Sequence, residues 1–404
     1  MKTKLISYCL ITFLLTPTLS TAITLQHTTI QQGVQNYPFN NDYFFDRIIT
    51  FLLKIGHYPS MSACIINNTI VVWKNGYGFY DMELQKSATE STIYTVASIT
   101  KTITSTALMQ LYEQELFDLD DDINYYLPFS VRNPNFPDDP ITIRMLLSHS
   151  SSFKPDPLSY HWFNFSQAPP ISWYPNPWLE EYLLPSGAFY SPEIWDTEYR
   201  PGEYMQYANI NFDLIAYLVQ LFSKQPFHEY CNDHIFIPLK MTHTSFRLPD
   251  LPIENIAIPY LYQNRTYEKL PYYQLLHYPI GGLMTTVEDL SHFLIAHMNY
   301  GVYNGTRILN EDTVELMHTI QPPGNIYINF HYGLGWMIVE TPIGKNVYIG
   351  HSGDIPGLHT RMFIDTSENT GIICFFNSDR STSIEKFVSL LIQYLLFTKA
   401  RQFS

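Results

Sequence analysis

Residues 98–112 read SITKTITSTALMQLY, and from Thr102 onward this run holds small or apolar side chains and no charge. Such a composition predicts a helix that is buried on every side. Ser98 stands where this helix begins, near the positive end of the helix dipole. Lys101 lies three residues further on, so it falls on the same helical face within reach of the Ser98 hydroxyl. Burial would lower the pKa of this lysine, which could then accept the serine proton.

The Ser-x-x-Lys spacing by itself is not specific. It occurs again at Ser151–Lys154 and at Ser383–Lys386. The first copy runs into a proline and a loop, so nothing fixes its two side chains on one face. The second copy opens a helix whose first turn carries further charge, and Ser383 is expected to be a plain N-cap there. Only Ser98 has a buried setting, and we expect it to be the reactive serine.

A second candidate is Tyr207, two residues before Asn209. A tyrosine can transfer protons once neighbouring cations lower its pKa, and an asparagine beside it can orient a substrate. The Tyr-x-Asn spacing is common in a chain with 31 tyrosines, and it recurs at residues 230–232, 262–264 and 327–329.

The third candidate is His351-Ser352-Gly353, directly after a predicted strand at 347–349. Glycine at this point would let the backbone approach a bound substrate closely. The stretch nearly matches a nucleophile elbow, but Asp354 stands where that motif needs its second glycine. No crossover strand–turn–helix pattern surrounds it, which excludes an α/β-hydrolase.

Composition excludes several other classes of function. The chain has 404 residues, a net charge of −14, 46% hydrophobic residues and 15% charged residues, which is sufficient for a packed core. No basic run exists to neutralise phosphates, so neither nucleic acid nor an anionic membrane surface is an expected partner. The sequence has no Gly-rich phosphate loop, and His228 and His234 lack the spacing of a zinc protease, so no cofactor and no metal is expected.

The first 22 residues have the pattern of a secretory signal peptide. Two lysines precede an apolar run from Leu5 to Leu15, and small residues follow at Ser20–Ala22. The apolar run is too short to span a bilayer. We therefore expect cleavage near Ile23 and export to the periplasm or the medium, with no stable membrane span afterwards. An uncleaved membrane anchor is the alternative.

Residues 23–404 are expected to form one domain. Segments with strand character lie near both ends of the chain, at 62–66, 69–73, 333–340, 347–349, 361–364 and 371–376. Helical patterns occur at 41–55, 102–112, 211–224, 287–299 and 383–398. Turn residues at 67–68 and 366–369 separate neighbouring strands. This order predicts an α/β (mixed α+β) fold with one sheet assembled from both chain ends and covered by helices.

Residues 154–200 differ from the rest of the chain because they are dense in aromatic residues and prolines. A loop-rich insertion of this length is usually functional, as a lid or a pocket wall. A surface excursion that packs on its own aromatic side chains is an equal alternative.

Three cysteines remain after the predicted signal peptide: Cys64, Cys231 and Cys374. Cys64 and Cys374 lie in apolar segments with strand character, so buried free thiols are expected. One disulfide is also compatible with the sequence.

Taken in order, the three candidate motifs resemble those of the serine β-lactamase and penicillin-binding protein family, in its class C and DD-peptidase-like branch. The resemblance covers about residues 40 to 395 and is interrupted only in the insertion. Other segments similar to the family are 146–149, 225–246, 279–290 and 332–336. The resemblance implies a central antiparallel sheet flanked by helices, with a subdomain of helices and loops.

The resemblance also implies a role for each candidate. Ser98 would be the nucleophile and Lys101 its activating base. Tyr207 would relay protons to the leaving group, and Asn209 would help to position the substrate. The backbone N–H groups of Ser98 and Asp354 would form the oxyanion hole.

One departure from the family pattern bears on the substrate. His351 stands where β-lactamases have a lysine, ahead of Ser352 and Gly353 in the same substrate-binding motif. A lysine is charged at pH 7, whereas a histidine is mostly neutral there and gains a proton toward pH 6. The departure favours a peptidase or esterase over a β-lactamase, with binding of carboxylate substrates that strengthens as the pH falls.

The sequence thus predicts an exported serine hydrolase that acts through an acyl-enzyme on an amide or ester. Its substrate would be a D-amino-acid peptide, an ester or a β-lactam-like molecule. The alternative is a non-catalytic binding or scaffold protein on the same fold. Such a protein could lose Ser98, Lys101 or Tyr207, and all three are present.

Overall fold

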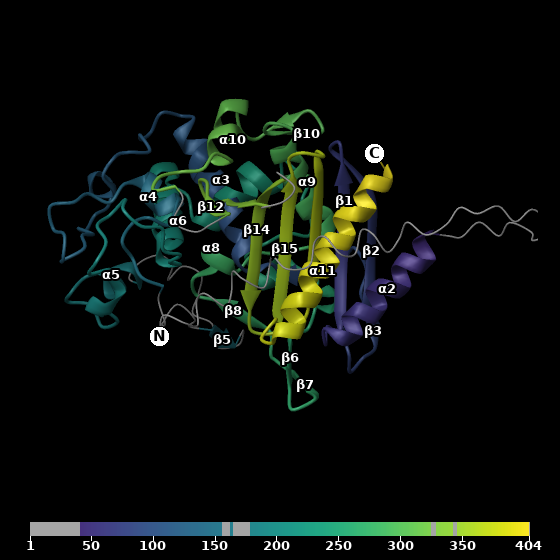
Figure 1. Ribbon diagram of the computed structural model, residues 1–404. Coiled ribbons are helices and arrows are strands. Elements are labelled where there is room, and N and C mark those ends of the chain that lie inside the picture. The colour runs from purple at the N-terminus through teal and green to yellow at the C-terminus, as the bar shows by residue number, and fades with distance from the viewer. Residues whose placement is uncertain (1–40, 156–161, 165–177, 325–328, 342–345, 404) are drawn as a thin grey trace, which may run out of the picture.

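An eight-stranded antiparallel sheet lies at the centre of the computed structural model, which describes residues 41–155, 162–164, 178–324, 329–341 and 346–403 (Figure 1). The first strand of the chain pairs with the last one, with Ala63 opposite Cys374. The strands follow one another across the sheet as β12 (Phe330–Tyr332), β13 (Met337–Glu340), β14 (Val347–Ile355), β15 (Leu358–Asp365), β16 (Thr370–Phe376), β1 (Ser60–Asn67), β2 (Ile70–Asp81) and β3 (Lys86–Ser87). The predicted sheet built from both chain ends is confirmed.

Helices cover both faces of this sheet and form a separate group at its β12 edge (Figure 1). They are α2 (Asn41–Ile55), α3 (Thr100–Tyr112), α4 (Ile143–Leu147), α5 (Trp178–Leu183), α6 (Ile210–Ser223), α7 (Phe227–Cys231), α8 (Tyr278–Gly281), α9 (Val287–Met298), α10 (Glu311–Met317) and α11 (Ser383–Ala400). Four short strand pairs complete the described part: β4 (Tyr94–Thr95) with β9 (Met284–Thr285), β5 (Trp162–Asn164) with β8 (Tyr273–Leu275), β6 (Tyr260–Gln263) with β7 (Thr266–Lys269), and β10 (Val302–Tyr303) with β11 (Thr306–Arg307).

The central strands are apolar on both faces because both faces are covered. In β1, Cys64 and Ile66 belong to the core shared with α3, α6 and α9, whereas Ala63 and Ile65 belong to the core under α2 and α11. Every residue of β1, β15 and β16 is buried. Successive side chains of a strand point to opposite faces of the sheet. A strand of a sheet that is covered on both faces is therefore apolar along its whole length.

The uncharged run after Lys101 forms α3, which lies in the middle of the molecule. All of its residues from Thr100 to Met109 are buried. The hydroxyl groups of its threonines are paired within the helix or across it, for example Thr104 Oγ1 to the carbonyl of Pro279 at 2.7 Å. The prediction of a helix buried on every side is confirmed.

Two local predictions about the sheet need correction. The turn between β1 and β2 uses Asn68 and Thr69, with φ of 47° and 66°, one residue later than the expected Asn67-Asn68. Two positive φ values are what a tight hairpin turn of this kind requires. Only the second half of the strand expected at 333–340 forms, as β13, and residues 333–336 make the turn that joins it to β12. A Cβ at Gly335 in this turn would lie 1.7 Å from the Ser105 hydroxyl oxygen of α3, so only glycine fits.

The structure confirms one further prediction, on the cysteines, and does not cover another, on the signal peptide. The three cysteines of the predicted mature chain are free and buried, as expected. The predicted signal peptide lies outside the described residues. Within the described ranges, no helix is both long and apolar enough to cross a membrane, and no group of acidic, histidine or cysteine residues could hold a metal ion.

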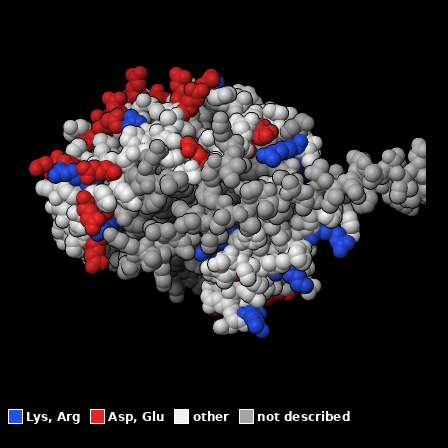
Figure 2. Space-filling model, in the orientation of Figure 1, with Lys and Arg blue, Asp and Glu red and all other residues white. Residues whose placement is uncertain are grey.

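On the face drawn in Figure 2, acidic side chains gather near α10 and the loops beyond α4, and basic ones are scattered.

The described parts of the 154–200 insertion pack against the rest of the domain. Its β5 pairs with β8, and Trp178 of α5 lies with its ring 4.6 Å from that of His277. At its C-terminal end Trp195 stacks on Phe153 at 4.3 Å. These contacts favour a wall of the domain over a surface excursion that packs only on itself.

Candidate active site

Ser98 lies in η1 (Ala97–Ile99), a short 3₁₀ turn that leads into α3. It therefore precedes the α-helix and does not belong to its first turn. The preceding Ala97 has a φ of 49°, a conformation that few residues other than glycine adopt. The turn is held by Val96, whose carbonyl accepts from the Thr360 hydroxyl at 2.7 Å. Ser98 is left half-buried at the end of this strained turn.

Lys101 is fully buried beneath Ser98. Its Nζ lies 3.1 Å from Ser98 Oγ and 2.7 Å from the carbonyl oxygen of Ile280. These two hydrogen bonds fix the position of the amine. Burial lowers the pKa of Lys101 to about 7, against the opposing negative charge of Asp213. At that pKa the amine is neutral in about half of the molecules at pH 7, so it can accept a proton from the hydroxyl it contacts.

Tyr207 packs against this lysine. The Lys101 Nζ lies 5.1 Å from the centre of the Tyr207 ring. His149 holds the chain on either side of Tyr207: its carbonyl accepts from the N–H of Gln206 at 2.7 Å, and its Nδ1 accepts from the N–H of Ala208 at 3.3 Å. The rings of His149 and Tyr207 are 4.3 Å apart. Tyr207 is thus brought to Ser98 and Lys101 by a histidine that lies 58 positions earlier in the sequence.

Asn209 stands immediately before α6, and its carbonyl accepts from the N–H of Phe212 at 2.9 Å. The Phe212 ring in turn lies 5.8 Å from the Lys101 Nζ. The start of α6, where Asn209 stands, is therefore close to the lysine.

Strand β14 supplies the third motif and lies against η1. A Cβ at Gly353 would lie 2.5 Å from the carbonyl oxygen of Val96 and 2.8 Å from the Cβ of Ala97. Only glycine permits this approach. The hydroxyl of Ser352, which is half-buried, lies 3.9 Å from the sulfur of Met337. The three motifs are thus brought together around Ser98.

Asp354, the next residue of β14, is held by two partners. Arg380 forms a two-pronged ion pair with its carboxylate at 2.7 and 2.8 Å, and His359 Nδ1 donates to the same carboxylate at 2.8 Å. Although burial opposes it, the charges of His359 and Arg380 hold the pKa of Asp354 well below its usual value. The side chain of Asp354 therefore fixes the end of β14, and its backbone remains the part predicted to contact substrate.

His351 does not have the chemistry predicted for it. The ring is fully buried, with Nδ1 2.7 Å from the carbonyl oxygen of Ser352 and Nε2 bonded to the hydroxyl of Tyr332. Since a carbonyl only accepts, Nδ1 carries the proton and Nε2 accepts from Tyr332. Burial and the charge of Lys101 lower the pKa of His351 to about 3, against the hydrogen bond to Ser352. The expectation that His351 gains a proton toward pH 6 is wrong.

The other copies of the motifs lie elsewhere. Ser151 donates to the side chain of Asn211 at 2.5 Å. The prediction that Ser383 caps α11 is wrong. The N-cap is Thr382, in a reciprocal capping box with Glu385. Tyr230 stacks on His234, and the ring of Tyr262 stacks on His57. The copy at 327–329 falls partly outside the described residues.

Sequence reasoning missed four residues that shape the site: His149, Asp213, Ile280 and Tyr332. Three of them belong to segments similar to the family, but nothing in their spacing shows which side chain faces the lysine. A weak sequence signal pointed to Asp213, because it is a charged residue within the otherwise apolar pattern of α6.

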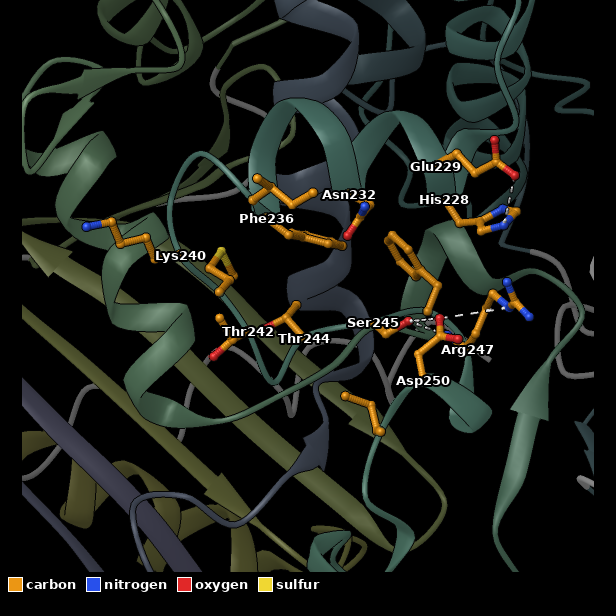
Figure 3. A pocket seen from close by; sticks show the side chains of 14 residues that line it. His228, Glu229, Asn232, Phe236, Lys240, Thr242, Thr244, Ser245, Arg247 and Asp250 are labelled. Carbon is orange, nitrogen blue, oxygen red and sulfur yellow. Dashed lines mark hydrogen bonds and ion pairs between the residues drawn. The ribbon is translucent and has the colours of Figure 1, made fainter.

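A pocket on another part of the surface does not involve these residues. It is lined by residues around α7 and the following turn, among them His228, Asn232, Lys240, Thr244 and Arg247 (Figure 3). None of the predicted catalytic or substrate-binding residues lines it. The polar side chains that line this pocket do not indicate a particular ligand.

A serine hydrogen-bonded to a buried lysine, beside a tyrosine and against a strand of an antiparallel sheet, has the arrangement expected of a serine hydrolase. The chain belongs to the beta-lactamase family of serine hydrolases, whose model matches residues 45–394. The resemblance drawn from the sequence is therefore confirmed.

Individual relatives are distant. The chain is 28% identical to Protein flp of Staphylococcus aureus (strain N315) over 353 residues, which are 87% of this chain and 65% of that protein. It is 27% identical to the "Putative D-alanyl-D-alanine carboxypeptidase" of Escherichia coli (strain K12), over 72% of this chain and 71% of the relative. The chain thus spans slightly less than two thirds of the length of the staphylococcal protein.

Solved structures with the same fold include an octameric penicillin-binding protein homologue from Pyrococcus abyssi. Its TM-score is 0.69 at 23% identity, over 89% of this chain and 78% of that one. A D-amino acid amidase from Ochrobactrum anthropi has a TM-score of 0.69 at 20% identity, over 89% of this chain and 100% of that one. These likenesses confirm the β-lactamase and transpeptidase-like fold.

Proposed function

We propose that this protein is an exported serine hydrolase that cleaves an amide or ester through an acyl-enzyme. The observation that carries the proposal is the 3.1 Å contact between Ser98 Oγ and the buried Nζ of Lys101, whose pKa burial lowers to about 7. A hydroxyl beside a neutral amine is the minimal arrangement for an activated serine nucleophile.

The first half of the reaction forms the acyl-enzyme. Ser98 Oγ attacks the substrate carbonyl carbon, and its proton passes to the neutral Nζ of Lys101. The backbone N–H groups of Ser98 and Asp354 receive the developing oxyanion, which the close approach of Gly353 to Ala97 supports. The carbon–nitrogen or carbon–oxygen bond then breaks, and the leaving group takes a proton relayed from Lys101 through Tyr207.

The second half reverses these steps with water. Water attacks the ester carbonyl and gives one proton to the neutral amine of Lys101. The carbon–oxygen bond to Ser98 then breaks, Lys101 returns that proton to Ser98 Oγ, and the acid is released. Asn209, Ser352 and Gly353 are assigned to substrate contacts because the resemblance to the family implies these roles.

For the substrate, we propose a small amide, peptide or ester, with β-lactams as poor substrates. The neutral, fully bonded ring of His351 supports this preference, because it leaves no positive charge at the place where β-lactamases have a lysine. The names of two similar proteins, a carboxypeptidase for D-alanyl-D-alanine and a D-amino acid amidase, favour substrates with a D-configured residue.

The test is covalent labelling of the purified protein with a fluorophosphonate, followed by mass spectrometry of its peptides. We expect one adduct, on Ser98, and turnover of at least one member of a panel of D-aminoacyl amides, D-alanyl peptides, short esters and β-lactams. The absence of any adduct and any turnover would favour the alternative of a non-catalytic binding protein.

A further inference from the structure

Asp213 and His277 form a buried hydrogen-bonded pair that the proposed reaction does not use. His277 Nδ1 lies 2.8 Å from an oxygen of the Asp213 carboxylate, and the two side chains are 3% and 2% exposed. The edge of the Trp178 indole, from the insertion, packs on the histidine ring at 4.6 Å. A carboxylate is costly to bury without a charged or hydrogen-bonded partner, so such a pair needs a reason for being there.

The two residues lie on the two elements that contact Lys101. Asp213 follows Phe212 in α6, and the Phe212 ring is 5.8 Å from the Lys101 Nζ. His277 is the residue just before α8, and the carbonyl of Ile280 in α8 accepts from the same Nζ at 2.7 Å. The pair thus ties α6 to α8 next to the lysine.

The charge of Asp213 reaches Lys101. It raises the pKa of the lysine and opposes the larger effect of burial, which lowers it. The other groups that face Lys101 are Ser98, the ring of Tyr207, and the imidazoles of His149 and His351. Burial and the positive charge of Lys101 lower the pKa of both imidazoles, so they are neutral.

We propose that Asp213 and His277 are positioning residues for Lys101. They stabilise its ammonium form until the proton is passed on through Tyr207 to the leaving group. Resting on the serine–lysine function proposed above, this inference assigns the paired carboxylate the task of balancing the charge that Lys101 gains from Ser98. His277 donates from Nδ1 to the Asp213 carboxylate, and its place before α8 keeps the Ile280 carbonyl against the ammonium group. Trp178 closes the pair off from solvent.

The test is the titration of Lys101 itself. In protein labelled with ¹³C at the lysine Cε, the signal of Lys101 is assigned by its loss in Lys101→Ala, and its midpoint is followed with pH. Asp213→Asn keeps the shape and removes the charge, so we expect the midpoint to fall by about one pH unit. The acid limb of fluorophosphonate labelling should move by the same amount.

Two further substitutions separate charge from packing. His277→Leu removes the donor and should shift the midpoint in the same direction as Asp213→Asn. His277→Asn places an N–H near the position of Nδ1 and should restore most of the native midpoint. Asp289→Asn is the matched control, because Asp289 is another buried aspartate whose partners are the N–H of His243 and the hydroxyl of Thr244. It should leave the midpoint of Lys101 unchanged.

The outcomes distinguish this inference from the proposed function. A midpoint that stays at its native value in both Asp213→Asn and His277→Leu overturns the inference, whether or not Ser98 reacts. A midpoint that moves in a protein that is never labelled overturns the proposed function and leaves the role of the pair in setting the charge of Lys101 intact.

Discussion

The hydroxyl of Tyr332 donates a hydrogen bond to Nε2 of His351, and the opposite ring nitrogen lies 2.7 Å from the carbonyl oxygen of Ser352. Both nitrogens of His351 are therefore occupied by neutral groups of the protein. Since the ring is fully buried and its pKa is lowered to about 3, it stays neutral throughout the range in which enzymes of this kind are assayed.

The pH dependence of substrate preference follows from this arrangement. We expect the ratio of kcat/KM for a peptide with a free carboxylate to that for a neutral ester to be constant within about twofold between pH 8 and pH 6. His351 itself does not change its charge in that interval, and protonation of Lys101 lowers the rate with both substrates. The measurement uses both substrates at each pH, so loss of active protein cancels. A ratio that rises tenfold toward pH 6 would mean that His351 gains a proton.

The choice of nucleophile is tested by three serine substitutions. Ser98→Ala should abolish labelling and turnover while the thermal unfolding temperature stays within a few degrees, because little volume changes. Ser151→Ala and Ser383→Ala are the matched controls, since each removes the serine of another Ser-x-x-Lys copy. Ser151→Ala should cost some stability through the loss of its bond to Asn211, but both control proteins should still be labelled. An active Ser98→Ala protein would contradict the assignment.

Lys101 should control the acid limb of the reaction. Its pKa of about 7 means that the neutral amine is lost as the pH falls, so the acylation rate at pH 6 should be roughly tenfold below that at pH 8. Lys101→Ala should lower the acylation rate by a factor of order 10² to 10⁴ and remove this limb. Stopped-flow acylation by a chromogenic ester measures both. An unchanged rate in Lys101→Ala would exclude it as the base.

Gly353 should be intolerant of any side chain. A Cβ there would lie 2.5 Å from the Val96 carbonyl oxygen, which is backbone and cannot move without shifting the turn before Ser98. We expect Gly353→Ala to lower kcat by about 10² to 10³, the usual effect of losing one oxyanion donor. Gly371→Ala is the control, because its nearest neighbours are the Met298 sulfur at 2.9 Å and a Leu294 methyl at 3.1 Å, which can rotate away. Equal losses in kcat would show that the position of Gly353 has no special role.

Buried neutral histidines should make the fold acid-sensitive. Burial lowers the pKa of His149, His297, His351 and His359 below 6.5, the value expected in the unfolded chain. Below pH 6.5 the unfolded chain therefore binds more protons than the folded one, and the free energy of unfolding falls. Asp379 acts in the opposite direction, because burial raises its pKa to about 6 and the folded state gains its proton first.

Because the histidines outnumber this carboxylate, we expect the free energy of unfolding to fall by about 2–4 kcal/mol from pH 7.5 to pH 5.5. Urea unfolding at the two pH values measures the change. In His297→Gln the fall should be smaller by about 1 kcal/mol, since one of the buried histidines that titrate is gone. A free energy that stays constant over this interval would mean that these histidines are protonated in the folded protein.

Local patterns in the sequence were sufficient for most strands of the central sheet and for the five longest helices. The uncharged run at 102–112 indicated a buried helix, and the apolar segments near both ends of the chain indicated strands, because periodicity and turn residues act over a few neighbours. The motifs at Ser98, Tyr207 and His351 were found in the same way. Small errors at Asn68 and Ser383 arose where two adjacent residues offer nearly the same turn or cap.

Only the tertiary structure decided which motifs meet and what charge they carry. Three copies of Ser-x-x-Lys have the same spacing, but only Lys101 is placed under its serine by α6 and α8, which come more than 100 residues later in the sequence. The pKa of Lys101 and the neutral state of His351 depend on burial and on the distant residues Asp213 and Tyr332. Desolvation and Coulomb interaction act through space, so no spacing along the chain can reveal them.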